Sequence, residues 1–169
     1  MPREIRGWPD DRLHLCQSAP LGGGRKRGKQ KQAVGPSRGG RNTKIHALAD
    51  AKGRLLPILL TGGEAHDCPV AERLICRVEP PKCMLGDKAY DSAELREELD
   101  KQGTKPVIPN RSNRKEPFRF SKRLYKLRWR IEAAFNRLKD YRRIATRYDK
   151  LARNYLASVC LAEALVWWI

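Results

Sequence analysis

Residues 124–141 read Leu-Tyr-Lys-Leu-Arg-Trp-Arg-Ile-Glu-Ala-Ala-Phe-Asn-Arg-Leu-Lys-Asp-Tyr, a stretch that contains neither glycine nor proline. Its apolar side chains recur in steps of three and four, which is the period of an amphipathic helix. We therefore expect one helix here, packed on the core through an apolar seam. The seam consists of Leu124, Leu127, Ile131, Phe135 and Leu138.

Four polar residues of the same stretch fall within roughly 60° of arc on the helical wheel, at about 100° per residue. They are Tyr125, Arg128, Glu132 and Lys139. Their stripe lies beside the apolar seam, so we expect Glu132 at the edge of the core, facing a cleft. The alternative is a solvated charged face in which Arg128 and Glu132 form a weak surface pair.

The spacing of these four residues resembles the signature helix of bacterial insertion-sequence transposases, which carry a DDE catalytic triad. Two upstream segments resemble the same family. Gly-Asp-Lys-Ala-Tyr-Asp at 86–91 is similar to the segment with the second catalytic aspartate, and 37–50 is similar to the entry into the second strand. The resemblance runs from about residue 29 to 169. It implies an α/β, ribonuclease-H-like mixed sheet with flanking helices.

By this resemblance, Asp87 and Glu132 are the expected catalytic residues and the ligands of Mg²⁺ or Mn²⁺. Strand cleavage and joining are in-line displacements at phosphorus, for which two metal ions activate the attacking oxygen and stabilise the leaving one. Hard cations prefer carboxylate oxygens. Tyr125, Arg128 and Lys139 would contact DNA phosphates beside the scissile bond. The alternative for Asp87 is a turn aspartate that caps the residues after it.

The charge of the chain points to a polyanionic partner. The formal net charge is +17, and the basic excess lies in residues 1–44 and 111–153, on either side of a near-neutral centre. We expect double-stranded DNA, at transposon ends and target sites, as the partner, and a homodimer on DNA as the assembly to consider. A membrane surface is the competing partner, but the basic residues are not confined to one short amphipathic helix.

Five cysteines without a CxxC pair support neither a disulfide framework nor a structural zinc site, which suits a cytoplasmic, nucleoid-associated protein. The apolar C-terminal segment 151–169 is interrupted by polar residues, so we expect a core-packing helix instead of a membrane span.

Apolar runs and turn signals predict a mixed order of strands and helices between residues 43 and 120. Pro57 should mark an open edge or a bulge in the second strand. The expected elements are a hairpin of strands at 43–49 and 54–60 around the turn 50–53, a helix at 69–78, a strand at 82–85, a helix at 91–101 begun by a capping box of Asp91 with Glu94, a strand at 105–108 and a basic loop at 109–120.

The N-terminus departs from the family, because no Asp-Ser or Asp-Thr pair stands where the first catalytic aspartate is expected. Back-translation of residues 11–21 with chosen codons gives family-like sequence one nucleotide out of frame. We therefore expect a disordered basic segment over 1–42, out of the family frame up to about residue 27, and a partial catalytic domain over 43–169. The first strand should be missing or disrupted, although Leu13 and Leu15 alternate. Asp11 is the candidate replacement ligand if the frame is intact.

The remaining candidates each have a functional and a structural reading. His66 and Asp67 favour a structural or helix-capping role, and Trp129 a place in the core or an interface. The run 25–31 is either a DNA-contacting arm or a basic linker. Three further arginines either contact additional DNA phosphates or form a solvated face: Arg142, Arg143 and Arg147.

The expected function is that of a transposase catalytic domain, which cleaves and transfers DNA strands at insertion-sequence ends. With only two carboxylates assured, we expect it to be impaired. The alternatives are a non-catalytic basic RNA- or ribosome-binding protein, in which both acids are incidental, and a repair or maturation nuclease of the same fold.

Overall fold

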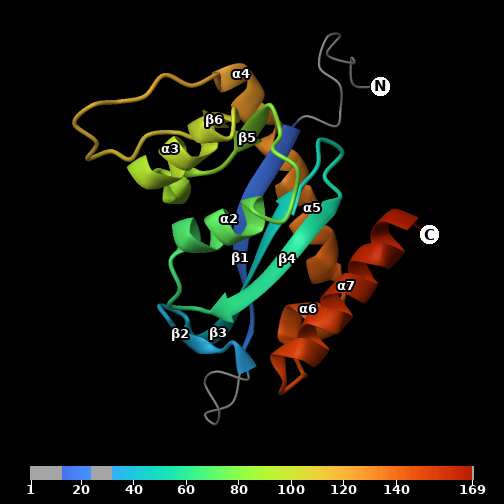
Figure 1. Cartoon of the computed structure of the whole chain (residues 1–169). Coiled ribbons are helices and arrows are strands. Elements are labelled where there is room, and N and C mark those ends of the chain that lie inside the picture. The colour runs from blue at the N-terminus through green and yellow to red at the C-terminus, as the bar shows by residue number, and fades with distance from the viewer. Residues whose placement is uncertain (1–12, 24–31, 169) are drawn as a thin grey trace.

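The computed structural model describes residues 13–23 and 32–168, which form a central mixed sheet with helices on both faces (Figure 1). The sheet order in the described residues is β2-β3-β1-β5-β6, and β4 also pairs with β3. The strands are β1 (Leu13–Gly23), β2 (Gly35–Ser37), β3 (Gly40–Ala49), β4 (Leu55–Gly62), β5 (Cys83–Leu85) and β6 (Lys105–Val107).

Strand β1 lies in the middle of the sheet, antiparallel to β3 and parallel to β5. Leu13, Leu15 and Ala19 are buried against one helical layer, whereas Cys16 is buried against the other. This is the pattern of a strand covered on both faces. The expectation of a missing or disrupted first strand is therefore wrong, because the alternating apolar side chains of this segment fill both cores.

The predicted division into a basic segment over 1–42 and a partial catalytic domain over 43–169 stays a prediction, although part of the first segment forms strands. Residues 13–23 and 35–42 belong to β1, β2, the start of β3 and the turn between the last two. The hypothesis of a wrong reading frame stays a prediction, and the nucleotide sequence of the gene tests it. Outside the described residues lie Asp11 and the basic run 25–31.

Helices cover both faces of the sheet (Figure 1). Leu74 and Leu95 pack with Cys16 on one face, and Ile131 and Phe135 pack with Leu15 on the other. The predicted mixed α/β architecture is confirmed. The helices are α2 (Asp67–Ile75), η2 (Lys88–Tyr90), α3 (Ala93–Lys101), α4 (Lys122–Tyr125), η3 (Lys126–Arg128), α5 (Trp129–Asp140), α6 (Arg142–Thr146) and α7 (Ala152–Trp168).

The predicted hairpin joins β3 to β4 and is confirmed. The Asp50 carboxylate accepts hydrogen bonds from two backbone N–H groups of the turn, at 2.9 and 3.0 Å. Gly53 adopts a φ of 88°, which favours glycine. Pro57 lies where the pairing of β4 with β3 shifts register, as expected for a residue without a backbone N–H.

The predicted helix over 124–141 is present as a continuous helical run made of α4, the 3₁₀ turn η3 and α5. Ile131, Phe135 and Leu138 of the predicted seam are buried in the core. Trp129 is 58% exposed, so a core position is wrong for it, and an interface position stays a prediction.

The N-cap of the helix after β5 lies one residue later than predicted. Ser92, and not Asp91, is its N-cap, and the Ser92 hydroxyl accepts a hydrogen bond from the Leu95 N–H at 3.3 Å. A serine at this position satisfies one of the free N–H groups of the first turn. Asp91 is thereby free to face inward, where it is buried.

Arg147 is neither a phosphate contact nor a solvated residue, because its side chain is buried. It donates hydrogen bonds to the Thr43 hydroxyl and the Gln32 carbonyl, and its guanidinium lies 4.9 Å from the ring centroid of Tyr155. The arginine thus connects the segment before β2 with α7. No helix in the described part of the chain is long and apolar enough to cross a membrane.

We predict that Leu15→Ala lowers the free energy of unfolding by about 2–5 kcal/mol, the range for truncating a buried leucine. Urea unfolding followed by circular dichroism measures the change. The matched control is Leu56→Ala on the edge strand β4, where the leucine is 36% exposed and the loss should stay below about 1 kcal/mol. Equal losses for the two variants would show that β1 is not a core strand.

Candidate functional site

Asp87 lies where the chain leaves the sheet after β5. The residue before it is Gly86, where an added Cβ would lie 3.2 Å from the ring of the buried Tyr90, so the glycine lets this ring pack against the backbone. The Asp87 carboxylate accepts a hydrogen bond from the Ala89 N–H at 2.7 Å and caps η2. Asp87 therefore caps the turn and also lies at the carboxyl end of an interior strand, where ligands of open α/β sheets bind.

Strand β1 brings a glutamine toward Asp87 instead of a carboxylate. The parallel register pairs Leu15 with Leu85, so Gln17 and Asp87 each lie two residues beyond the last pair. Gln17 also stands opposite Ala47, on the face that packs against α5. The amide Oε1 of Gln17 is buried and has no hydrogen-bond partner in the described residues.

The pKa of the Cys16 thiol on β1 is shifted by its burial and by nearby carboxylates. Burial, followed by the nearby carboxylates of Asp67 and Asp87, raises the pKa of the Cys16 thiol to about 12. Cys16 itself is a protonated core thiol, and it faces the layer of α2 and α3.

Glu132 lies in the first turn of α5, and its side chain is 44% exposed. Its carboxylate accepts a hydrogen bond from Arg128, whose guanidinium lies 5.8 Å from the ring centroid of Tyr125. Phe120 packs edge-on against the same ring. The structure thus links three residues of the predicted polar stripe by contact. Lys139 is exposed further along α5 and makes no hydrogen bond or ion pair in the described residues.

The two predicted catalytic acids are not joined to each other. No hydrogen bond or ion pair connects Asp87 to Glu132, and the described residues hold no group of three His, Cys, Asp or Glu that could bind a metal ion. On β1, the residue at the level of Asp87 is Gln17, which has a neutral amide, and β1 holds no Asp or Glu. Mg²⁺ is held chiefly by carboxylates in such sites. The described donor set therefore fits the expected metal pair poorly.

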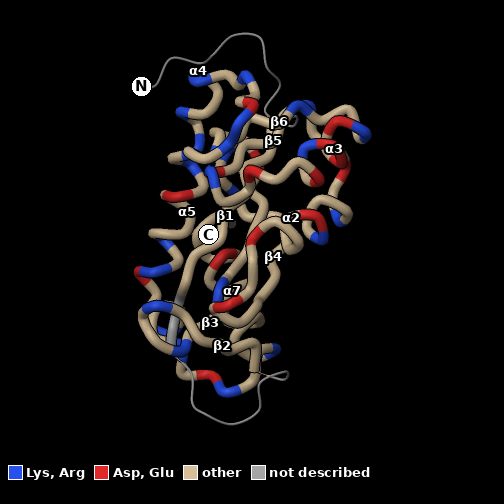
Figure 2. Tube along the Cα trace, turned by 90° about the vertical axis from the view of Figure 1, so that its left-hand side faces the viewer, with Lys and Arg blue, Asp and Glu red and all other residues tan. Residues whose placement is uncertain are grey.

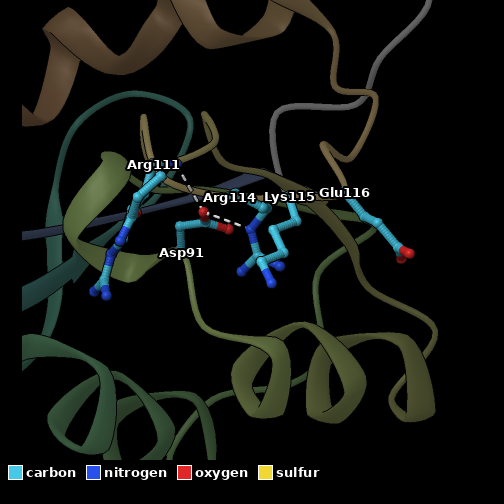
Figure 3. A pocket seen from close by; sticks show the side chains of 6 residues that line it. Asp91, Arg111, Arg114, Lys115 and Glu116 are labelled. Carbon is cyan, nitrogen blue, oxygen red and sulfur yellow. Dashed lines mark hydrogen bonds and ion pairs between the residues drawn. The ribbon is translucent and has the colours of Figure 1, made fainter.

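A buried charge cluster that the sequence did not reveal surrounds Asp91, four residues after Asp87 (Figure 3). The side chain of Asp91 is fully buried and accepts hydrogen bonds from Arg96 Nε (3.0 Å), Arg114 Nε (2.8 Å) and the Arg111 backbone N–H (2.8 Å). Arg96 is buried as well and donates from Nη2 to the Ile108 carbonyl at 2.9 Å. The arginines that follow β6 were the only sequence signal for this cluster.

A second polar cluster lies under the start of α2. His46 is buried on β3, and its Nε2 lies 2.7 Å from the Thr61 hydroxyl. Lys44 Nζ donates to Asp67 Oδ1 at 3.2 Å, and His46 Nδ1 lies 3.8 Å from the same oxygen. His66 is the N-cap of α2 but makes no capping hydrogen bond through its side chain. Asp67 therefore has a structural role in these contacts.

Comparison with known proteins gives matches along nearly the whole chain. The family model described as Transposase DDE domain matches residues 13–167. The protein assigned as transposase of insertion sequence element IS6501 of Brucella ovis is 38% identical over 127 residues, which cover 74% of this chain and 97% of the relative. The protein assigned to IS402 of Burkholderia cepacia is 28% identical over 170 residues, which cover 94% of this chain and 78% of the relative.

Among solved structures, the catalytic core domain of HTLV-2 integrase in complex with magnesium matches with a TM-score of 0.52 and 12% sequence identity. The match covers 97% of this chain and 92% of that one. A likeness at this identity shows the fold alone. It confirms the predicted ribonuclease-H-like sheet with flanking helices, and β1 provides the strand that was expected to be absent.

We predict that stability falls as the pH drops from about 6.5 to about 4 because of His46. Burial lowers the pKa of His46 to about 4, so between these pH values the unfolded chain binds the proton and the folded protein does not. The stabilisation is complete above the unfolded pKa, and its loss in acid is about 3 kcal/mol. Urea midpoints across this range measure it.

The variant His46→Gln should flatten this pH dependence, because glutamine does not titrate and can keep a hydrogen bond to the Thr61 hydroxyl. The matched control is His66→Gln at an exposed position, which should retain the pH dependence of the unmodified protein. An unchanged slope in His46→Gln would contradict the assignment of the effect to this histidine.

Proposed function

The chain belongs to the family of transposases with a DDE domain, and from this premise we propose that it is a transposase catalytic domain that binds double-stranded DNA but is impaired in cutting it. The DNA is that of insertion-sequence ends and target sites. The observation that carries the proposed impairment is that β1 holds no Asp or Glu and carries the amide of Gln17 at the level of Asp87.

The proposed DNA binding rests on charge and on its location. The net charge of +17 attracts a polyanion regardless of sequence, and release of counterions from DNA makes such binding strongly salt-dependent. Figure 2 shows Lys and Arg along α4 and α5. We assign Tyr125, Arg128 and Lys139 as phosphate contacts on this side, in keeping with the family resemblance.

Asp87 and Glu132 are the acidic positions that we assign to catalysis and to metal binding. Divalent metal ions supply activation of the attacking oxygen in this class of reaction. Because the described residues offer two carboxylates and one amide, binding of Mg²⁺ or Mn²⁺ should be weak. Arg128 keeps the Glu132 carboxylate oriented and partly neutralised. A homodimer on DNA, with the exposed Trp129 at an interface, is part of the same proposal.

The second candidate is a non-catalytic nucleic-acid-binding protein on the same fold. It is favoured by one observation, which is that both acids already have local partners: the Ala89 N–H for Asp87 and Arg128 for Glu132. In that case the carboxylates stabilise the turn and the helix and hold no ion. The two candidates differ in whether any divalent-metal-dependent cleavage exists.

We predict that the purified protein binds a short DNA duplex with steep salt dependence and shows little Mg²⁺-dependent nicking of supercoiled plasmid. With about six phosphate contacts, the affinity should fall on the order of 10³-fold between about 50 and 200 mM salt. Fluorescence anisotropy measures the binding, and agarose gels measure the nicking.

The control for binding is Lys139→Gln, which removes one exposed cation and should lower the salt slope by about 0.9. The control for cleavage is Asp87→Ala. Robust nicking by the unmodified protein that disappears in Asp87→Ala would overturn the proposed impairment, and binding that does not respond to salt would overturn the proposed DNA contact.

A further inference from the structure

We propose that residues 110–119, the loop between β6 and α4, form a preorganised surface that binds the phosphate backbone of double-stranded DNA. The inference rests on the DNA binding proposed above and assigns it a surface outside the signature helix. Residues 110–119 hold four Lys and Arg against one Glu. The segment leads directly into α4 and from there to Arg128 and Glu132. A DNA strand bound on the loop would therefore continue toward these two residues.

The loop is ordered although it contains neither helix nor strand. Asn110 closes it, because its side-chain amide donates to the Phe118 carbonyl and accepts from the Phe118 N–H, each at 2.9 Å. The ring of Phe118 lies 4.5 Å from the Arg96 guanidinium and 4.9 Å from that of Arg114. Such cation–π contacts hold the closing residue on the buried cluster. A loop fixed in this way loses little entropy when it binds a ligand.

Asp91 attaches the loop to the folded core. Burial by itself would raise the pKa of its carboxyl, but hydrogen bonds from Arg114, the Arg111 N–H and Arg96 lower it below the ordinary value. The carboxylate therefore stays ionised at neutral pH and keeps its hydrogen bonds to the loop. A buried charge of this kind is tolerated only when it is fully paired. The bonds from Arg111 and Arg114 to Asp91 therefore hold the loop against the core.

Arg111 connects the loop to the turn that carries Asp87. Its guanidinium donates to the Lys88 carbonyl from Nε at 3.3 Å and to the Ala89 carbonyl from Nη2 at 3.0 Å. Ala89 is also the residue whose N–H binds the Asp87 carboxylate. The loop is thus held next to one of the two acids assigned to catalysis, and it leads into the helix that carries the other.

An open pocket of about 430 Å³ beside Asp91 offers donors that suit a phosphate group. Lys115 is exposed and has no hydrogen bond or ion pair in the described residues, whereas the charge of Asp91 is already neutralised by arginines. Figure 3 shows the Glu116 carboxylate directed away from Asp91. Arg, Lys and Asn side chains are common phosphate ligands. The pocket is lined by Asp91, Arg111, Asn113, Arg114, Lys115 and Glu116.

The test compares the salt dependence of duplex binding for the full chain, Lys115→Gln and Lys101→Gln. Lys115 makes no contact that the fold needs, so its loss should leave the thermal midpoint unchanged. Lys101 is also an exposed lysine, at the end of α3 and outside the loop, and its substitution gives the same change in net charge. The slope of log K against log salt is negative, and its magnitude should decrease by about 0.9 for Lys115→Gln and stay the same for Lys101→Gln.

Two results would overturn the inference while the proposed function stands: binding by the unmodified protein with equal slopes for both variants, or a loss confined to an RNA duplex of the same sequence. Absence of any salt-dependent duplex binding by the unmodified protein would instead refute the proposed function, and the inference with it. A slope reduced in Lys115→Gln on DNA, with Lys101→Gln unaffected, establishes the loop as a phosphate contact.

Discussion

The architecture depends on β1 being held on both of its edges. It pairs antiparallel with β3 over most of its length and parallel with β5 through Leu13, His14 and Leu15. Its alternating side chains then enter both cores, since Leu15 faces α5 while Cys16 faces α2 and α3. Without this strand, β3 and β5 would both have open edges, which sheet proteins avoid. The position of Asp87 at the end of β5 follows from the same pairing.

Much of this architecture could be predicted from the sequence where one physical signal dominated. The apolar seam with Ile131 and Phe135 gave the helix, and the turn with Gly53 gave the hairpin, because the periodicity and turn chemistry in those places are local properties of the chain. The prediction failed for β1, where the alternation of Leu13 and Leu15 was given less weight than the departure from the family pattern. Burial of Arg147 could not be read from the sequence, since its partners are distant and periodicity does not distinguish a buried arginine from a solvated one.

The candidate site was predictable in its residues more than in its geometry. The spacing placed Tyr125, Arg128 and Glu132 on one stripe, and the structure links them by contact. The register of β1 against β5 places Gln17 at the same level as Asp87. The loop anchored by the buried Asp91 depends on interactions across more than 20 residues. Register and buried ion pairs are long-range properties, and local sequence patterns do not encode them.

We propose that β1 presents the amide of Gln17 where a functional metal site needs a carboxylate. The most direct test is a calorimetric titration with Mn²⁺. It compares the unmodified protein with Gln17→Asp, each with and without Asp87→Ala. We expect Gln17→Asp to bind Mn²⁺ about tenfold or more tightly than the unmodified protein, because affinity rises with the number of carboxylate ligands. We also expect Asp87→Ala to abolish this gain. Equal Mn²⁺ binding by the two proteins would contradict it.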